Sequence, residues 1–287
     1  MTGGKIFFDR VTIIGVGLIG ASLALSLRHN NICGTIIGFG RKEENLSRAK
    51  KRGIIDDYSL DVKQACHDSD LIVLSTPVSV FGGIIKSIKD IIKKGCLLTD
   101  VGSVKGKLVY QIESMIPEGA FYIGSHPIAG SDKSGIDDAK PDLFESALCV
   151  ITPTENSDTE SLRKIAVLWE GIGAKVKFMD PYKQDEIYGA VSHLPHVVAY
   201  ALVNTIGDID SGFIEYAGQG FKDTTRIALS SPEMWRDIVL QNRENLLRFL
   251  DIFIENIEKT KRYIQDMDTD SLKEEFSKAK KFRETIS

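Results

Sequence analysis

The chain has 287 residues, and its 36 lysines and arginines against 40 aspartates and glutamates give a formal net charge of −4. Hydrophobic residues make up 43% and charged residues 26%, which is ordinary for a globular protein and excludes an intrinsically disordered chain. Because there is no basic excess to neutralise phosphates, we expect no nucleic-acid partner.

The N-terminus and the cysteines favour a cytoplasmic location. Residues 1–10 lack the apolar stretch of a secretory signal. The most apolar run of the second half, residues 197–206, falls far short of the roughly 20 residues that a membrane span needs. No C-x-x-C pair occurs, which argues against a zinc site or a disulfide framework. The scattered cysteines are Cys33, Cys66, Cys96 and Cys149. We therefore expect neither a membrane partner nor a bound metal.

The first half of the chain alternates short β-branched runs with helical stretches, as parallel sheets with crossover helices do. The expected strands are residues 11–15, 35–38, 71–75, 96–100, 121–124, 148–152 and 176–179. The expected helices are residues 18–28, 43–51, 80–92 and 158–171, and Ser103 could cap a further helix that runs toward Met115. This order predicts an α/β dinucleotide-binding domain of Rossmann type over residues 1–180, with a mostly parallel sheet and helices on both faces.

Strand signals stop after Asp180, and helical periodicity continues to the end of the chain. Pro181 suits the first turn of a helix, and Ser231-Pro232-Glu233 is a second helix start. Apolar residues recur at helical spacing from Trp235 to Ile257, and such a stripe must be buried. We therefore expect a helical substrate and dimerisation domain over residues 181–287, shared between the subunits of a homodimer.

The segment from Gly15 to Gly20 has the pattern G-x-G-x-x-G between an expected strand and an expected helix. In that context it predicts a dinucleotide-binding turn, although the pattern alone is a weak signal. Gly15 allows the tight turn, Gly17 lets the backbone approach a pyrophosphate, and Gly20 lets the helix pack close to the strand. The helix N-terminus then faces the anion. The expected cofactor contacts are Gly15, Gly17, Leu18, Ile19, Gly20, Arg41, Ser75, Thr76, Pro77 and Asp100.

Arg41 bears on the choice of cofactor. The second strand ends in Gly38-Phe39-Gly40-Arg41, where sites that prefer NAD usually carry an acidic residue. No carboxylate at this position would repel a 2′-phosphate, and a guanidinium could bind one bidentately. We expect NADP or NAD as cofactor, with NADP accepted. Alternatively, Arg41 stacks on the adenine or is solvated.

Three of the five histidines lie in distinctive contexts. His126 follows an expected strand, at the sheet edge where ligands of open α/β sheets gather. His193 and His196 are three residues apart, so they point to roughly the same side of a helix that Pro195 deforms. A metal site would need a third ligand, and buried structural histidines are a further alternative. Ser103 could cap a helix or hold a catalytic imidazole in the correct tautomer.

Five motifs carry a resemblance to a known family. They are G-x-G-x-x-G, D-V-G-S-V-K, G-S-H-P-I-A-G-S-D-K-S-G, S-H-L-P-H, and G-F-K-D-T-T-R-I-A followed by M-W-R-D. From about Val11 to Leu250, the chain resembles the prephenate/arogenate dehydrogenases of tyrosine biosynthesis. The resemblance implies an NAD(P)-dependent oxidoreductase that converts prephenate to 4-hydroxyphenylpyruvate. A hydride passes from C4 to the nicotinamide, and the ring carboxylate leaves as CO₂.

The same resemblance assigns roles to site residues. It implies that His126 is the base or hydrogen-bond acceptor for the 4-hydroxyl, with Ser103 hydrogen-bonded to it. It implies that Arg226 binds the ring carboxylate, although a domain-interface salt bridge is the alternative. His196 would position substrate and nicotinamide. The remaining substrate-site residues are Asp223, which would orient a cationic group, Trp235, which would wall the pocket, and His193, which would support it.

Asp132 leaves the substrate open. Arogenate carries an ammonium where prephenate carries a keto group, so a carboxylate there would attract arogenate. Asp132 could instead pair with Lys133 or belong to a lid over residues 131–144. Arogenate or dual specificity therefore stays an alternative. Another two-domain hydroxyacid or imine dehydrogenase, or a dinucleotide sensor without catalysis, would share the fold but not this set of residues.

Overall fold

The computed structural model describes residues 7–130 and 135–286. The chain forms two compact units, Met1–Asn242 and Arg243–Ser287. The domain boundary expected at residue 180 stays a prediction. The first unit extends beyond that residue because helices after it pack onto the loops of the sheet, as shown below.

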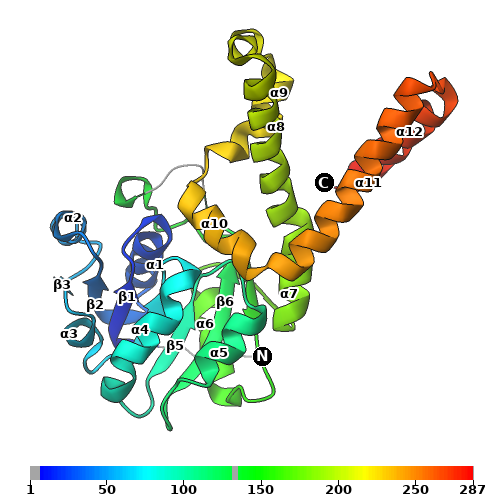
Figure 1. The fold of residues 1–287 in the computed structure, drawn as a ribbon. Helices are drawn as coiled ribbons and strands as arrows, with labels where there is room; N and C mark the ends of the chain where they lie inside the picture. Colours follow the sequence, from blue (N-terminus) through cyan, green and yellow to red (C-terminus); the bar gives the residue numbers. More distant parts are fainter. Residues whose placement is uncertain (1–6, 131–134, 287) are drawn as a thin grey trace. The chain divides into compact units, whose positions relative to one another are not determined.

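The first unit is built on an eight-stranded sheet with the order β3-β2-β1-β4-β5-β6-β7-β8 (Figure 1). Neighbouring strands pair in parallel, apart from β6 and β7, which are antiparallel. The strands are β1 (Phe8–Ile14), β2 (Cys33–Phe39), β3 (Asp57–Ser59), β4 (Leu71–Leu74), β5 (Leu97–Asp100), β6 (Phe121–Pro127), β7 (Leu148–Thr152) and β8 (Lys175–Phe178). The predicted mostly parallel α/β sheet is confirmed.

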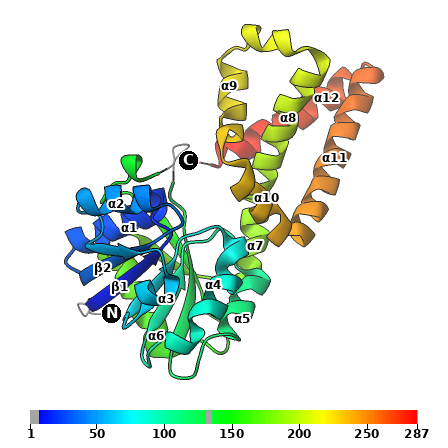
Figure 2. The same cartoon turned by 60° about the vertical axis from the view of Figure 1, so that its left-hand side comes forward.

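Helices cover both faces of this sheet because successive strand residues point to opposite sides. Ile13 packs with the apolar residues of α1 and α6, whereas its neighbour Ile14 packs with those of α4 and α5. The helices of this part are α1 (Leu18–His29), α2 (Glu43–Lys51), α3 (Val62–Cys66), α4 (Phe81–Ile88), α5 (Gly106–Glu113) and α6 (Thr159–Gly171). Figure 2 shows α4 and α5 together on one side of the sheet.

Three local details differ from the sequence prediction. The short elements β3 and α3 were not predicted, since three and five residues are too few to establish a periodicity. His126 lies inside β6 rather than after the strand, because pairing with β7 extends β6 to Pro127. Ser103 does not cap α5, which begins at Gly106 with Lys105 in the capping position.

The remainder of the first unit is helical. It contains α7 (Pro181–Tyr188), a π-helical turn (Gly189–His193), α8 (Leu194–Asp210), α9 (Gln219–Thr225) and α10 (Pro232–Gln241). The predicted helix starts are present: Pro181 lies in the first turn of α7, and the Ser231 hydroxyl accepts from Met234 N at the start of α10. The apolar stripe expected from Trp235 to Ile257 is interrupted at Asn242, where α10 ends.

The second unit consists of α11 (Arg243–Gln265) and α12 (Thr269–Glu284). The two helices lie side by side, and an ion pair of 2.6 Å joins Lys259 to Glu275. No residue of α12 is buried within the described chain.

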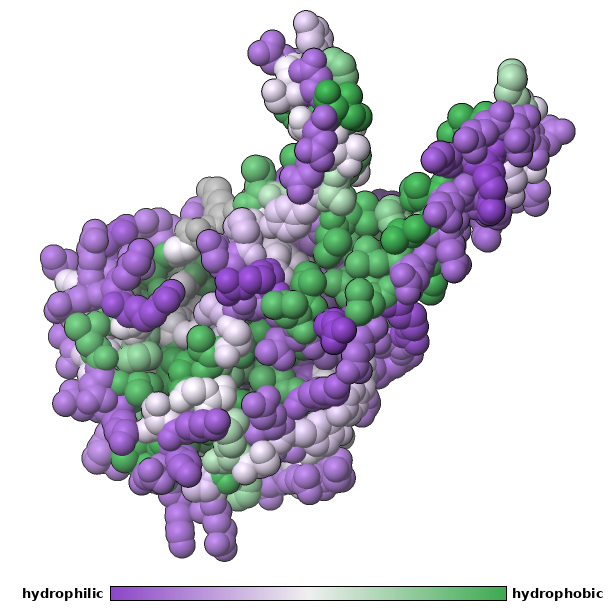
Figure 3. Space-filling model, in the orientation of Figure 1, coloured by the Kyte–Doolittle hydropathy of each residue, from purple (hydrophilic) through white to green (hydrophobic). Residues whose placement is uncertain are grey.

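Many large apolar side chains after residue 181 are exposed. Figure 3 shows hydrophobic residues on the surface of these helices. The helical run Pro181–Tyr216 is also long and apolar enough for a membrane span by length and composition alone. That criterion is weak evidence, since the core helix of a soluble protein meets it as well. The exposed set includes Val191, Ile209, Phe213, Leu240, Ile252 and Ile257.

Candidate active site

The glycine-rich turn joins β1 to α1 where the strand order reverses, the usual position of a ligand in such sheets. Gly15 has φ +101°, and a Cβ added to it would lie 2.5 Å from the Ser75 carbonyl oxygen. A Cβ on Gly20 would lie 2.2 Å from the Gly15 carbonyl oxygen. A Cβ on Gly17, in contrast, would meet nothing within 4 Å. Gly15 and Gly20 are therefore needed for packing, whereas Gly17 borders open space.

The first turn of α1 offers free backbone donors beside that space. Gly17 caps α1 without a side-chain hydrogen bond. The N–H groups of Leu18, Ile19 and Gly20 precede the first intrahelical donor, Ala21 N, which bonds to Gly17 O at 2.9 Å. Open space at Gly17, and N–H groups at a helix N-terminus that bond to none of the described residues, are what a pyrophosphate requires, so these residues fit a dinucleotide.

The predicted neighbours of the glycine turn lie beside it. Ser75 N donates to Ile14 O at 2.8 Å, and the Thr76 methyl would be 2.9 Å from a Cβ on Gly15. Thr76 Oγ1 is buried and has no hydrogen-bond partner among the described residues, and Pro77 is exposed. On the other side of the turn, Phe39 O accepts from Gly15 N at 2.8 Å. Arg41 comes two residues after Phe39, so it lies close to the turn in the chain, and its side chain is exposed.

Asp100 does not have the environment expected of a cofactor contact. Its side chain is fully buried, and its oxygens accept from Tyr122 Oη at 2.9 Å, Ser125 N at 3.1 Å and Gly102 N at 2.9 Å. It also forms a buried ion pair with Lys105. Since a carboxylate with this many donors has no surface left for a ligand, we reassign Asp100 to support of the loop after β5.

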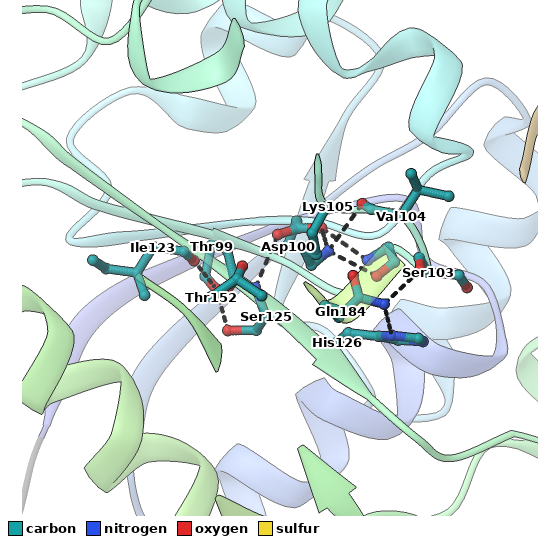
Figure 4. A network of polar contacts seen from close by, with 12 residues as sticks. Thr99, Asp100, Ser103, Val104, Lys105, Ile123, Ser125, His126, Thr152 and Gln184 are labelled. Carbon is teal, nitrogen blue, oxygen red and sulfur yellow. Dashed lines mark hydrogen bonds and ion pairs between the residues drawn. The ribbon is translucent and has the colours of Figure 1, made fainter. Parts of the chain in front are cut away.

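His126 and Ser103 are joined through Gln184 (Figure 4). Gln184 Nε2 lies 3.2 Å from His126 Nδ1 and donates to the Ser103 carbonyl oxygen at 3.1 Å. The expected bond from the Ser103 hydroxyl to His126 is not among the hydrogen bonds of the described residues. Ser103 is half-buried in the loop after β5, and Gln184 reaches it from α7.

The surroundings of His126 favour a neutral ring. Burial lowers the pKa of His126 well below its usual value, and the positive charge of Lys105 lowers it further. The Tyr188 ring packs edge-on against the imidazole, with centroids 4.8 Å apart. A neutral imidazole can accept or share a proton near neutral pH, which a permanently charged one cannot.

The π-helical turn brings His193 and His196 to one aromatic ring, Trp235. His196 stacks on the indole with centroids 3.5 Å apart, and His193 meets it edge-on at 5.9 Å. His196 Nδ1 donates to Ser192 O at 2.9 Å, which leaves its Nε2 as an acceptor. His193 is fully buried, its Nδ1 lies 3.0 Å from Asn242 Nδ2, and burial lowers its pKa to about 4.

Trp235 also connects this histidine pair to the loop after β5. Trp235 and Ile238 of α10 pack with Val104, the residue next to Ser103. Burial lowers the pKa of His196, and the positive charge of Arg226 lowers it as well. Arg226 begins a short helical turn, Arg226–Leu229, that packs against α8, the helix of His196. Ser103, Trp235 and His196 therefore gather in one region, and Arg226 stands on a turn beside the helix of His196.

The roles of two further substrate residues, Asp223 and Asp132, stay predictions. Asp223 is exposed and accepts from Gln219 Nε2 at 2.7 Å. Asp132 lies outside the described residues, as does the start of the expected lid over residues 131–144. Within residues 7–130 and 135–286, no group of three His, Cys, Asp or Glu side chains could hold a metal ion.

The residue that sequence reasoning missed is Gln184, together with its neighbour Asp185. Asp185 Oδ1 accepts from Lys105 N at 2.7 Å and so fixes the N-terminus of α5. Burial raises the pKa of Asp185 from 3.8 to about 7. No spacing or motif marks these two polar residues, which stand in the helix Pro181–Tyr188.

The chain is similar to known proteins along its length. Residues 23–178 match the model of the prephenate dehydrogenase nucleotide-binding domain, and residues 180–278 match that of its dimerization domain. The chain is 34% identical to prephenate dehydrogenase of Bacillus subtilis, over 97% of this chain and 76% of that protein. It is 31% identical to cyclohexadienyl dehydrogenase of Zymomonas mobilis, over 96% of this chain and 95% of that protein.

A solved structure is similar over the whole chain. It is prephenate dehydrogenase from A. aeolicus in complex with hydroxyphenyl propionate and NAD+. The two structures agree with a TM-score of 0.92 and 37% identity, over 99% of this chain and 100% of that one.

Proposed function

The chain belongs to the prephenate dehydrogenase family, and we propose that it converts prephenate to 4-hydroxyphenylpyruvate in tyrosine biosynthesis. It is an NAD(P)-dependent oxidoreductase with a nucleotide-binding domain. The observation that carries the proposal is the buried, neutral imidazole of His126. Gln184 joins it by hydrogen bonds to the loop that carries Ser103. His126 also lies on the same sheet as the strand that leads into the glycine turn.

The bound dinucleotide would supply the hydride acceptor. Gly17 and the free N–H groups at the start of α1 would hold its pyrophosphate. Ser75 and Thr76, beside the turn, would border the same cofactor. We keep Leu18, Ile19 and Pro77 as further proposed contacts.

His126 would act on the 4-hydroxyl of the substrate. As hydride leaves C4, positive charge develops on the carbon and its hydroxyl, and a neutral imidazole that accepts the hydroxyl proton stabilises that charge. Loss of CO₂ from the opposite ring position returns an electron pair and makes the ring aromatic. Acceptance of a proton in this way typically contributes about 10²–10⁴-fold in rate.

The substrate carboxylate would bind Arg226. Arg226 is exposed and begins a short helical turn that packs against α8, the helix of His196. His196 itself lies flat on Trp235. A planar fork of donors suits a carboxylate, and the stacked rings form a rigid wall beside it. His193 is buried behind that wall and would support it.

Turnover tests the proposal directly. Purified protein is mixed with prephenate or arogenate and with NAD+ or NADP+, and reduced nicotinamide is followed by absorbance. We expect turnover of prephenate. Cofactor binding without turnover of either substrate would favour the non-catalytic dinucleotide sensor, and turnover of only a small hydroxyacid would favour the other dehydrogenase class.

The same assay addresses substrate preference. Arogenate or dual specificity remains the second candidate, because a relative of this chain is named cyclohexadienyl dehydrogenase and Asp132 adds a carboxylate to the motif. Asp132→Asn should shift the ratio of kcat/KM away from arogenate. An unaltered ratio would remove Asp132 from substrate recognition.

For the cofactor, we propose that NADP+ is accepted alongside NAD+. The similar solved structure contains NAD+, and in this chain the exposed Arg41 follows β2. Arg41→Ala should raise KM for NADP+ more than for NAD+, and Arg163→Ala on the exposed face of α6 serves as the matched control. A strong NAD+ preference that is the same in wild type and Arg41→Ala would reject this role.

We also propose a homodimer formed through the C-terminal helices. Residues 180–278 match a dimerization domain, and Ile257 of α11 is 54% exposed. Sedimentation should give twice the 31.7 kDa of one chain. Ile257→Glu should weaken the dimer, whereas Leu60→Glu, 53% exposed near β3, should not. Dissociation that is equal in both variants would contradict this interface.

A further inference from the structure

In the free protein, the contacts of the buried Gln184 side-chain amide determine its orientation. Its Nε2 lies 3.1 Å from the Ser103 carbonyl oxygen and 3.2 Å from His126 Nδ1 (Figure 4). A backbone carbonyl only accepts hydrogen bonds, so the amide atom that faces it must be the nitrogen. The loop after β5 therefore determines which end of the amide meets the imidazole.

This orientation determines where His126 carries its proton. The amide nitrogen is a donor, so Nδ1 must be the unprotonated ring nitrogen and the proton of the neutral ring lies on Nε2. His126 Nε2 forms no hydrogen bond with the described residues and is the nitrogen left for a ligand. In this state it presents an N–H group, which is a hydrogen-bond donor.

A donor at Nε2 is the wrong form for the proposed reaction, in which His126 accepts from the 4-hydroxyl. Rotation of the Gln184 amide by half a turn exchanges its nitrogen and oxygen. Gln184 Oε1 would then accept from Nδ1–H, and His126 Nε2 would be free to accept. Rotation would give Gln184 Oε1, which is now buried without a partner among the described residues, the Nδ1–H group as a donor. It would also turn Oε1 toward the Ser103 carbonyl oxygen, so the rotation requires that carbonyl to move away when substrate binds. The Ser103 carbonyl would lose its donor in exchange.

We propose that Gln184 is a positioning residue that sets the tautomer of His126. Its amide holds the ring proton on Nε2 in the free protein and rotates to accept Nδ1–H when substrate binds. The second half of this inference rests on the proposed function. The first half follows from the contacts of Gln184 alone, so the two can fail separately.

Nitrogen NMR of protein carrying ¹⁵N-labelled histidine reads the tautomer directly. The chain has five histidines, and the His126 signals are those absent from His126→Asn. We expect the Nε2–H form in free protein and the Nδ1–H form with NAD+ and 4-hydroxyphenylpropionate bound. An Nδ1–H form in free protein would overturn the first half, and an unchanged tautomer in the complex would overturn the second.

Two variants test whether Gln184 is the cause. Gln184→Met keeps the size but forms no such hydrogen bond, so both tautomers should appear and kcat should fall at least about tenfold, with little change in the Kd of NAD+. Gln184→Glu accepts but cannot donate, so free protein should already show Nδ1–H, and kcat should fall less than in Gln184→Met.

The control is the exposed Gln111 of α5, changed to Met and to Glu, which should leave both the tautomer and kcat unaltered. Wild-type tautomer and kcat in Gln184→Met would overturn the proposal. Absence of prephenate turnover in wild type would reject the proposed function, while the spectra of free protein would still decide the tautomer.

Discussion

Replacement of Gly17 with alanine should separate cofactor binding from folding. A Cβ at this position meets no atom within 4 Å, and its φ of −99° is open to any L residue. The gain from a stiffer unfolded chain, about 0.4–1 kcal/mol, roughly offsets the poorer capping by alanine. The free energy of unfolding should therefore change by less than about 1 kcal/mol.

The same methyl group would occupy the space that a pyrophosphate needs. Loss of one hydrogen bond to a charged group costs about 1.5–3 kcal/mol, which corresponds to a rise of roughly 10- to 150-fold in the Kd of the cofactor. Calorimetric titration with NAD+ and NADP+ measures the Kd, and thermal unfolding without cofactor measures stability.

Gly20→Ala is the matched control, since it adds the same methyl group three residues later. That Cβ would lie 2.2 Å from the Gly15 carbonyl oxygen and 2.9 Å from Ile13 Cγ2, so the backbone must move. Overpacking of this kind typically costs about 1–3 kcal/mol, and we expect a lower Tm as well as weaker binding. Unchanged affinity in Gly17→Ala, or a Tm as low as that of Gly20→Ala, would refute this reasoning.

Three further predictions concern the site. His126→Asn should lower kcat by about 10²–10⁴-fold with little effect on the Kd of NAD+; near-normal kcat would end its assignment as proton acceptor. Arg226→Ala should raise KM for prephenate by roughly 10- to 150-fold, with Arg163→Ala as the control, and an unchanged KM would return Arg226 to a structural role. Burial raises the pKa of Asp185 from 3.8 to about 7. Between pH 3.8 and about 7, the Asp185 carboxyl is therefore protonated in the folded chain and ionised in the unfolded chain. Stability of wild type should therefore fall as pH rises from about 4 to 7, and denaturant unfolding of Asp185→Asn should show a smaller fall; equal slopes would contradict the shift.

The features that sequence predicted well depend on local backbone geometry. Gly15 and Gly20 are required by a positive φ and by a close backbone approach within a few residues, so their spacing carries the information. Likewise, Pro181 and Ser231 mark helix starts through effects confined to one turn.

The features that it missed depend on contacts between distant segments. His126 was expected beyond the end of a strand, but pairing with Val150 of β7 keeps it within β6. Gln184 and Asp185 are polar residues on a helix, a pattern that normally indicates a solvated face. They are buried because the loop around Ser103, some 80 residues earlier, covers them, and no local pattern records that packing.

Two adjacent residues of α7 form hydrogen bonds with the loop after β5. Gln184 donates to Ser103 O, and Asp185 accepts from Lys105 N. A fragment that ends at residue 180 would therefore lack two contacts of the loop after β5. A fragment intended to retain this loop for isolated study should continue through Tyr188. For the same reason, exchange of helical modules between relatives should keep α7 with the sheet that it serves and place the junction after it.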